Sequence, residues 1–555
     1  MWIQNYFAVG NNVFLTALCA VLPFIFLFWA LAIKKMKGHV AILIAWLLTI
    51  LVALIVYRMP FATAMSAAGF GAIQGVFILC WLVINSVFLC NLIRKSGNFD
   101  VITASIASIS NDRRIQAILI GFCFSAFLEG TTGVAAPVAI GATMMIGLGF
   151  PAFTAVIVCL VGNTFPVPFG SIGLPTVTAV NAAFHGVEGS FLAVAGSVGG
   201  LMSAYAIITP FFMLIIMSGW KATKEVIPLC LVAGVSYAIP NFFIARYMGP
   251  ELPSLIAPLV SLGAVIAFLK FWKPKTIWRF EGEGLPVLNN NGGEINSSKK
   301  TLYAWTPFIM VIVFIIAWSQ PVFRAFAASL PFIIAIGPWP GLHGIVYQAV
   351  PIVPEPAIFP AHFNFNLFAS AGTALLIVSV LTTLLFKIKF SDFLKVLAAT
   401  FNQIKFALLT MILVFSIAQL SNYSGVSFTL GLAFAATGSL FMVFSPLIGF
   451  MGIFLTGTVT ATGALFASLQ RVTAEQLGFN PIITVTANIT GAVVGKLISL
   501  QSIALGAAAA GLVGQEGVIF SKLLKPALIL LGIGVVIILI LTHVFPGYFP
   551  ELIQS

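Results

Sequence analysis

Long apolar runs recur along the whole chain, and they restrict its fold more than any other feature. Residues 13–33, 75–93, 226–247 and 523–541 are examples. Each run is about 20 residues long, which is the length that an α-helix needs to cross the hydrocarbon core of a bilayer. Only 7% of the residues are charged, whereas about 25% are charged in a typical soluble domain. We therefore expect an all-α polytopic membrane protein with the lipid bilayer as its surroundings.

Basic residues lie in short clusters between the apolar runs and account for the net charge of +12. The clusters are Lys34/Lys35/Lys37, Arg94/Lys95, Arg113/Arg114, Lys221/Lys224, Lys270/Lys273/Lys275, Lys299/Lys300 and Lys387/Lys389. The positive-inside rule assigns such clusters to the cytoplasmic ends of membrane helices. This assignment places the N-terminus and the C-terminus outside. Because the charges are divided among separate loops, we expect no nucleic-acid partner.

Glycine and asparagine recur at matched intervals in the two halves of the chain. The two sets are Gly97, Gly130 and Asn163 in the first half, and Gly425, Gly457 and Asn488 in the second. The intervals are 33 and 33 residues in the first half, and 32 and 31 in the second. Neighbouring basic residues place Gly97 inside and Gly425 outside, so the halves run in opposite directions. This pattern predicts two inverted-topology repeats, as in secondary transporters, with a site near the midplane where broken helices meet.

The repeat divides the chain into four parts. We expect a first transmembrane repeat over 1–225, connecting transmembrane helices over 226–272, a cytoplasmic linker over 273–301 and a second repeat over 302–555. The linker assignment rests on its polar composition, which includes the stretch "LNNNGGEINSSKK".

Gly and Pro residues interrupt each repeat twice. The interrupted segments lie near 129–137 and 163–175 in the first repeat, and near 456–463 and 488–502 in the second. Such residues break the hydrogen-bond ladder of a helix. Irregular backbone at membrane depth is tolerated where it lines a cavity or is buried in protein. We therefore expect broken helices or re-entrant segments that meet at a small polar cavity, although tight packing of small residues also explains many of the glycines.

Glu129 lies inside the first interrupted segment, in the stretch "FCFSAFLEGTTGVAAPVAIG". An ionisable group within a membrane segment is costly and usually functional. Burial favours the neutral form of a carboxyl group, which suits a residue that takes up and releases a proton. The alternative is a structural carboxylate that accepts hydrogen bonds from the broken helix.

Lys496 lies in the last interrupted segment and is the basic counterpart of Glu129. It can pair with a substrate carboxylate or with Glu129, or it can extend toward the interface from a helix end. Thr, Ser, Asn and Gln side chains in the four segments could complete a binding site. These candidates are Thr131, Thr132, Asn163, Ser171, Thr458, Thr460, Asn488 and Gln501.

The sequence carries no motif of a soluble enzyme. It has no Walker A sequence and no HExxH. The five histidines and six cysteines show no metal-ligand spacing. We expect no catalytic activity, no cofactor and no metal site.

Several stretches resemble the L-lactate permease family of bacterial carriers. They include "GFCFSAFLEG" (121–130), "NTFPVPFGSIGLP" (163–175), "FSPLIGFMGIFLTG" (444–457) and "NITGAVVGKLISLQSIA" (488–504). The resemblance covers nearly the whole chain. It implies a proton-coupled symporter of the plasma membrane that carries lactate and glycolate. Under this interpretation Glu129 binds the proton and Lys496 binds the substrate carboxylate.

The chain departs from this resemblance within the predicted breaks. Members of the family usually have an aspartate at the position of Val459 and an asparagine at the position of Gly463. If that aspartate carries protons in relatives, this chain must rely more heavily on Glu129. The departures also leave the preferred carboxylate and its stereochemistry open.

Two other functions fit the same residues. The first is a Na⁺-coupled transporter of another small carboxylate, because Thr and Asn side chains and backbone carbonyls can also hold Na⁺. The second is a membrane sensor that binds a carboxylate without moving it. The sequence leaves the oligomeric state open.

Overall fold

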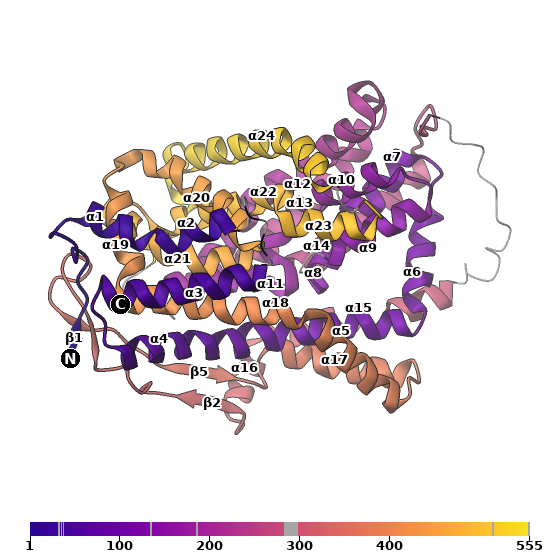
Figure 1. Ribbon diagram of the computed structural model, residues 1–555. Coiled ribbons are helices and arrows are strands. Elements are labelled where there is room, and N and C mark those ends of the chain that lie inside the picture. The colour runs from indigo at the N-terminus through magenta and orange to yellow at the C-terminus, as the bar shows by residue number, and fades with distance from the viewer. Residues whose placement is uncertain are drawn as a thin grey trace.

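The computed structural model describes residues 1–30, 34, 36, 38–133, 136–184, 187–281, 298–512 and 515–552. Within these residues, 11 helices are long and apolar enough to cross a membrane, or up to 12 if a sharply bent pair counts as one span. Figure 1 shows the helices bundled side by side along one long axis. The prediction of a polytopic helical membrane protein is thus confirmed.

The part of the chain predicted as the first repeat, residues 1–225, contains twelve α-helices among its described residues. They are α1 (Val13–Ala20), α2 (Leu22–Phe28), α3 (Gly38–Ile55), α4 (Phe61–Gln74), α5 (Trp81–Lys95), α6 (Asn98–Ala107), α7 (Arg113–Gln116), α8 (Ser125–Thr131), α9 (Ala136–Gly147), α10 (Ala152–Gly162), α11 (Gly170–Phe184) and α12 (Ser190–Lys224). Two π-helical stretches join neighbouring helices, η2 (Gly75–Cys80) and η3 (Ala117–Phe124), and a short 3₁₀ turn, η4 (Val167–Phe169), precedes α11.

The rest of the described chain is also mainly helical. Its helices are α13 (Ile227–Tyr247), α14 (Pro253–Phe271), α15 (Ser298–Ser319), α16 (Pro321–Ala328), α17 (Ala371–Leu385), α18 (Phe390–Ser424), α19 (Val426–Ala435), α20 (Phe441–Thr456), α21 (Val459–Gln476), α22 (Pro481–Gly495), α23 (Leu500–Ala509) and α24 (Glu516–His543). Three 3₁₀ turns accompany them, η6 (Gly438–Leu440), η7 (Lys496–Ile498) and η8 (Pro546–Tyr548).

Two small sheets cover one end of the bundle, and the sequence analysis did not anticipate them. Strands β1 (Trp2–Ile3), β3 (Val346–Gln348) and β4 (Ala357–Ile358) form one sheet in that order, with β1 parallel and β4 antiparallel to β3. Strands β2 (Ile333–Ile336) and β5 (Phe363–Asn366) pair antiparallel. Both termini lie at this end of the bundle, at the left of Figure 1.

The segments 61–95 and 390–424 pack against each other in opposite directions. Each spans 35 residues. A Cβ atom at Gly71 would overlap the backbone of Phe415, whereas further along Asn91 Nδ2 donates to Thr400 Oγ1 at 2.9 Å. Residue numbers therefore rise along one segment as they fall along the other. This is the arrangement that an inverted repeat requires of two matching segments.

The junctions that follow these two long segments are also alike. Gly97 and Gly425 both adopt left-handed backbone conformations, with φ of 76° and 94°. Glycine reaches this region without steric cost. Each glycine begins a ten-residue helix, α6 and α19. The inverted repeat as a whole stays a prediction, but its matching elements occur in the same order in both halves.

The linker is tied to the bundle at its start. Arg114 is buried and pairs with Asp112 at 2.8 Å and with Glu225 at 3.0 Å. It also donates to the backbone oxygen of Thr276 at 2.7 Å. Hydrogen bonds from Thr276 and Arg114 lower the pKa of the Glu225 carboxyl. Residues 273–281 thus pack on the ends of α7 and α12, and residues 282–297 lie outside the described part of the chain.

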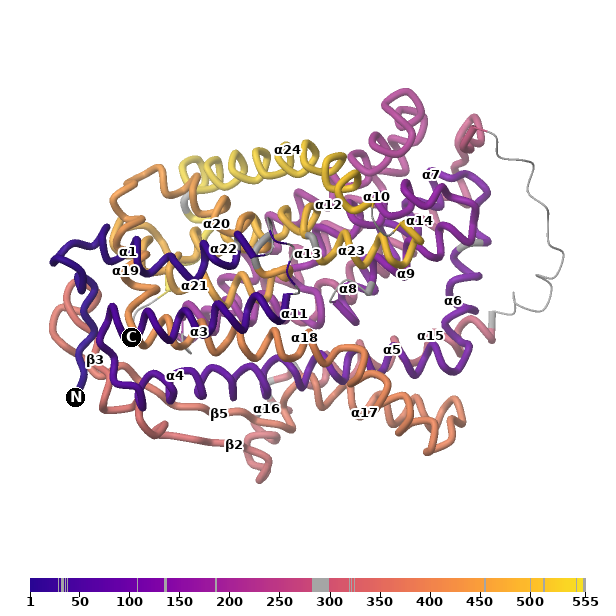
Figure 2. The backbone as a smooth tube through the Cα atoms, in the orientation of Figure 1, coloured from indigo at the N-terminus to yellow at the C-terminus, as the bar shows by residue number. Residues whose placement is uncertain are grey.

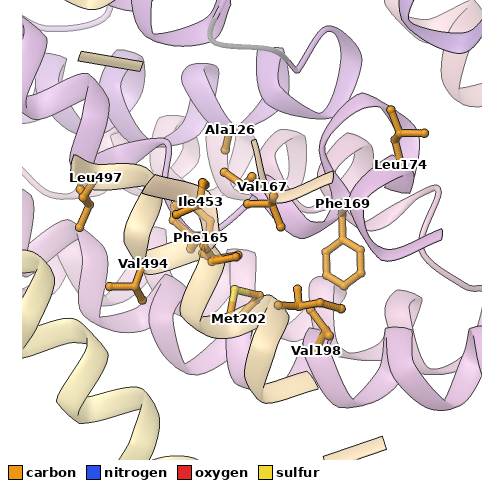
Figure 3. Close-up of a cluster of buried hydrophobic side chains, with 14 of the residues drawn as sticks. Ala126, Phe165, Val167, Phe169, Leu174, Val198, Met202, Ile453, Val494 and Leu497 are labelled. Atoms are coloured by element: carbon orange, nitrogen blue, oxygen red, sulfur yellow. The ribbon is translucent and has the colours of Figure 1, made fainter. Parts of the chain in front are cut away.

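Apolar packing holds the second break of each half in the middle of the molecule. Figure 3 shows side chains near η4, such as Phe165 and Val167, in one buried cluster with Ile453, Val494 and Leu497 from the second half. Turn η4 contacts α22, and turn η7 contacts α10. Figure 2 shows α8, α11 and α23 together near the centre of the bundle. The breaks are therefore fixed by the core, where polar groups of both halves can meet.

Candidate functional site

The first break of the first half places Glu129 near the end of a buried helix. Glu129 lies in α8, whose residues are all buried. The helix ends at Thr131 with Thr132 as its C-cap, and Gly133 follows with a left-handed φ of 55°. Residues 134–135 of this predicted break lie outside the described residues. The carboxyl group therefore sits at the interruption of the helix and not along a lipid-facing surface.

The second break of the first half contains three consecutive left-handed residues. Ser171, Ile172 and Gly173 have φ of 43°, 57° and 77°. This conformation costs roughly 1–2 kcal/mol for each non-glycine residue. Ser171 Oγ donates to the backbone oxygen of Thr132 at 3.1 Å, so the two breaks of this half interlock. A Cβ atom at Gly133 would overlap that hydroxyl group, which explains the glycine.

The two breaks of the second half interlock in a similar way. Gly457 ends α20 with φ of 78°, and a side chain there would overlap Gln501. Ser499 Oγ donates to the backbone oxygen of Gly457 at 3.4 Å. Thr458 caps the N-terminus of α21 and accepts a hydrogen bond from the backbone amide of Ala461 at 3.1 Å. The cap satisfies an amide that the helix start leaves unpaired.

Lys496 joins the two halves. It directly follows α22, begins η7 and is only 8% exposed. Its Nζ lies 3.1 Å from Glu129 Oε2 and donates to Asn163 Oδ1 at 3.0 Å. Asn163 in turn donates from Nδ2 to the backbone oxygen of Ser125 at 3.2 Å. One acid and one base, from different halves, therefore neutralise each other in the interior.

The Glu129 carboxylate is held closely but keeps hydrogen-bonding capacity. Its Oε2 is within ion-pair distance of Lys496, yet no described residue is oriented to give it a hydrogen bond. A Cβ atom at Gly170 would come within 2.7 Å of Oε1, so only glycine leaves room for the carboxylate there. The group can accept a proton or a polar ligand without breaking an existing hydrogen bond to Oε2.

A cavity of about 40 Å³ adjoins this ion pair. A cavity needs a volume of about 10–15 Å³ to hold one water molecule, so this one has room for a few waters. Its lining comes from all four breaks and from α18: Glu129, Gly133, Val167, Gly170, Ser171, Leu174, Pro175, Met411, Gly457, Thr458, Val459, Thr460, Lys496, Gln501 and Ser502. Among the predicted site residues, six line this cavity: Glu129, Ser171, Thr458, Thr460, Lys496 and Gln501.

The other four predicted residues lie elsewhere. Thr131 and Thr132 donate to the backbone oxygen of Leu128, within their own helix. Asn163 reaches the site through its hydrogen bond to Lys496. Asn488 lies inside α22, where it accepts a hydrogen bond from Gln470 at 3.3 Å.

Equal spacing matched Asn163 with Asn488, but the helix ends match differently. Helix α10 has 11 residues and Asn163 directly follows it, whereas α22 has 15 residues and Lys496 directly follows it. By position relative to the break, Lys496 is the counterpart of Asn163. These two residues, one from each half, are joined by the hydrogen bond from Lys496 Nζ to Asn163 Oδ1.

Some cavity residues were not among the predicted ones. Gly170 and Ser502 lie within predicted breaks, so a broader reading of those segments could have found them. Met411 lies in the middle of α18, in an unbroken apolar stretch, and carries no sequence signal. Val459 occupies the position where the resemblance expects an aspartate, and it lines the cavity. The cavity lining therefore contains one carboxyl group and one amine.

Comparisons with known proteins cover nearly the entire chain. The sequence profile described as L-lactate permease matches residues 16–545. The chain is 39% identical to the L-lactate permease of Bacillus subtilis (strain 168), over 99% of this chain and 100% of that relative. It is 38% identical to the glycolate permease GlcA of Escherichia coli (strain K12), over 98% and 99%. Among solved structures, the Alcanivorax borkumensis YdaH transporter is similar over 88% of this chain and 89% of that chain, with 11% identity and a TM-score of 0.44, a likeness too distant to add to the argument.

Proposed function

The chain belongs to the L-lactate permease family and is a membrane transporter, and we propose that it carries L-lactate, glycolate or a related 2-hydroxy monocarboxylate together with a proton. The transport takes place across the bacterial plasma membrane by alternating access. The relatives named above supply the substrate class. The observation that carries the coupling proposal is the buried pair of Glu129 and Lys496 beside a cavity.

Proton and substrate are coupled because two carboxylates compete for one lysine. In the unloaded state Glu129 is ionised and pairs with Lys496. Protonation of Glu129 removes its charge and releases the Nζ of Lys496. The substrate carboxylate then takes the place of Glu129 as the partner of the amine. Substrate thus binds well only to the protonated protein.

This exchange keeps the site neutral in both states. The unloaded site contains Glu129⁻ and Lys496⁺, and the loaded site contains neutral Glu129, Lys496⁺ and the substrate anion. An uncompensated charge in the interior of a membrane protein costs several kcal/mol. Either state can therefore cross between inward and outward access without carrying a bare charge, and a pH gradient drives uptake.

The polar residues around the pair orient the substrate in this scheme. Asn163 holds Lys496 in place through its 3.0 Å hydrogen bond. The side chains of Ser171, Thr458, Thr460 and Gln501 line the cavity and can bond the substrate carboxylate or its 2-hydroxyl group. We assign structural roles to Thr131, Thr132 and Asn488, because none of them lines the cavity and their side-chain oxygens bond to Leu128 or Gln470.

The first experiment measures uptake of labelled L-lactate by proteoliposomes with an imposed pH gradient, for wild type and Glu129→Gln. Wild type should accumulate lactate, and a proton ionophore should abolish accumulation. Glu129→Gln should exchange internal for external lactate without concentrating it, because its neutral side chain no longer links proton and substrate. A variant that still concentrates lactate would assign the proton to another group. Uptake that requires Na⁺ at a fixed pH gradient would favour sodium coupling instead.

A further inference from the structure

A second, larger cavity lies at the end of the bundle that carries the two sheets. Its volume is about 590 Å³, against about 40 Å³ for the cavity at Lys496. We call it the outer cavity, because the positive-inside assignment places this end outside. Its wall includes the segment around β3 and β5, and the ends of α11, α18 and α21. None of the residues discussed so far as substrate ligands lines it.

The same helix faces line both cavities. On α21, Thr460 lines the inner cavity, and Ala464, Ser468 and Arg471 line the outer one. These residues follow one another at intervals of three or four, so they lie on one face of the helix. The inner and outer cavities are therefore stacked along one face of α21.

Helix α18 repeats this arrangement. Met411 lines the inner cavity, and Phe415, Gln419 and Asn422 line the outer one at the same helical spacing. Helix α11 contributes Pro175 to the inner cavity and Asn181 onward to the outer one. Three helices thus run from one cavity to the other, which is the geometry of an access route.

A close contact separates the two cavities. A Cβ atom at Gly463 would lie 3.0 Å from Ala179 Cβ, so α11 and α21 touch at this level. Gly463 is one helical turn from Thr460 and directly precedes Ala464. The contact therefore lies between the α21 residues that line the inner cavity and those that line the outer one.

Arg471 is a cation on this route. It lies eleven residues beyond Thr460, or about 16 Å along the helix at roughly 1.5 Å per residue. Its Nε donates to Glu475 Oε1 at 2.6 Å, and its Nη1 donates to the backbone oxygen of Ala183 at 2.9 Å. The guanidinium also stacks over the ring of Phe184 at 5.6 Å. These contacts hold the group in place, and no described residue accepts a hydrogen bond from its Nη2, which can therefore donate to another partner.

We propose that the outer cavity is the entry vestibule for the substrate and that Arg471 forms a transient binding site for small carboxylates within it. Glu475 lines the same cavity and pairs with Arg471, so it acts as an internal competitor of the incoming anion. This proposal rests on the proposed function, because it assumes that the substrate is a carboxylate. It adds a binding site that precedes the one at Lys496.

The first test removes the charges of Arg471 and Glu475 in separate variants and measures the KM of lactate uptake. Arg471→Gln should raise KM about tenfold, which corresponds to about 1.4 kcal/mol, because the incoming carboxylate loses a charge-assisted contact. Arg471→Lys should recover part of the affinity. Glu475→Gln should lower KM about threefold, because the amide still accepts the hydrogen bond of Arg471 without competing as an anion. The maximal rate should change less than about twofold in each variant, because the site lies far from the cavity at Lys496.

If Arg471 and Glu475 formed only a structural ion pair, Arg471→Gln and Glu475→Gln would not shift KM in opposite directions. If both variants lower the maximal rate and leave KM unchanged, the pair is structural and the proposal fails. Arg246→Gln serves as the matched control, because Arg246 lies in the last turn of α13 and does not line the outer cavity. An equal KM change in this control would mean that general surface charge, and not the vestibule, is responsible.

The second test labels the cavity directly. The chain's six cysteines (Cys19, Cys80, Cys90, Cys123, Cys159 and Cys230) do not line the outer cavity, and five of them are buried. Asn181→Cys introduces a thiol in the cavity, and Gln476→Cys introduces an exposed thiol at the same end of α21 but outside it. A membrane-impermeant methanethiosulfonate added to intact cells should modify both, block uptake only in Asn181→Cys, and react more slowly there when lactate is present.

The labelling rate is read by mass spectrometry and does not depend on transport. If wild type fails to transport lactate but lactate still slows labelling of Asn181→Cys, the proposed function fails and the carboxylate site stands. If wild type transports lactate and modification of Asn181→Cys leaves uptake intact, the vestibule proposal fails and the proposed function stands.

Discussion

The two halves of the chain build their central breaks differently. In the first half, Gly170 lies against the Glu129 carboxylate, and the left-handed residues Ser171, Ile172 and Gly173 follow it directly. In the second half, Lys496 lies in an ordinary 3₁₀ turn at the end of a helix, with no left-handed residue beside it. One half therefore fixes an acid rigidly, and the other offers a base on a long side chain. The coupling pair exists only where the halves meet, so its formation depends on their relative position.

Removal of the base should have the largest effect. Lys496→Met leaves the buried Glu129 without its partner, and breaking a buried pair in this way costs about 3–5 kcal/mol unless the acid takes up a proton. Lactate uptake should fall below about 1% of wild type, since a charge-assisted contact contributes up to roughly 3 kcal/mol. The measurements are proteoliposome uptake and the thermal midpoint of the protein in detergent.

The double variant Glu129→Gln/Lys496→Met separates stability from transport. It should recover most of the thermal midpoint, because no lone charge is left in the interior, while uptake stays absent. A double variant as unstable as Lys496→Met would show that Lys496 stabilises the fold by packing and not through its charge.

Glycine substitutions should show that the first half is the more rigid one. A Cβ atom at Gly173 would approach the backbone of Pro250 to 2.4 Å, whereas one at Gly457 would meet mainly the side chain of Gln501, which can move. Both positions have positive φ, which alone costs about 1–2 kcal/mol for alanine. Gly173→Ala should add an overlap cost of about 1–3 kcal/mol, and Gly457→Ala should not.

The readouts for these two variants differ. Gly173→Ala should lower the thermal midpoint strongly and reduce the yield of folded protein. Gly457→Ala should fold nearly normally but raise the KM of lactate, because Gln501 is displaced at the cavity. Equal losses of stability in both variants would contradict the proposed difference between the halves.

An added acid tests whether one acid and one base suffice. Val459 is 2% exposed and lines the cavity with Glu129 and Lys496. Val459→Asp introduces the aspartate that is usual in the L-lactate permease family, but the site then contains two carboxylates and one amine. We expect KM to rise about tenfold at neutral pH, or about 1.4 kcal/mol, because the added carboxylate competes with the substrate for Lys496. KM should recover when acid pH protonates one carboxyl group. Val459→Asn should change KM little, and a decrease of KM in Val459→Asp would contradict the competition between carboxylates.

The membrane fold and the positions of the helix breaks could be predicted from the sequence, because they depend on composition and on helix-breaking residues. The long apolar runs indicated the membrane fold, and Gly and Pro residues marked the breaks that contain Glu129 and Lys496. The alignment of Asn488 with Asn163 stays a prediction; the helix ends suggest a different match, since α22 is longer than α10 and residue counting cannot detect this. Strands of two to four residues are too short for an alternation of apolar and polar residues to reveal them. Met411 entered the cavity through tertiary packing alone.

The smallest expected effect concerns the cap of α21. Thr458 lines the cavity but also accepts the amide hydrogen bond of Ala461, so its hydroxyl group already has a structural task. Thr458→Ala should destabilise the protein by about 1 kcal/mol through loss of the cap, and Thr458→Ser should restore the stability. If the hydroxyl group only caps the helix, the KM of lactate changes less than about threefold in Thr458→Ala, because the cavity loses no substrate ligand that contributes more than about 0.6 kcal/mol. A tenfold rise of KM in Thr458→Ala that Thr458→Ser reverses would instead give the second half a direct polar contact with the substrate, and the second half would then contribute more than a base to the site.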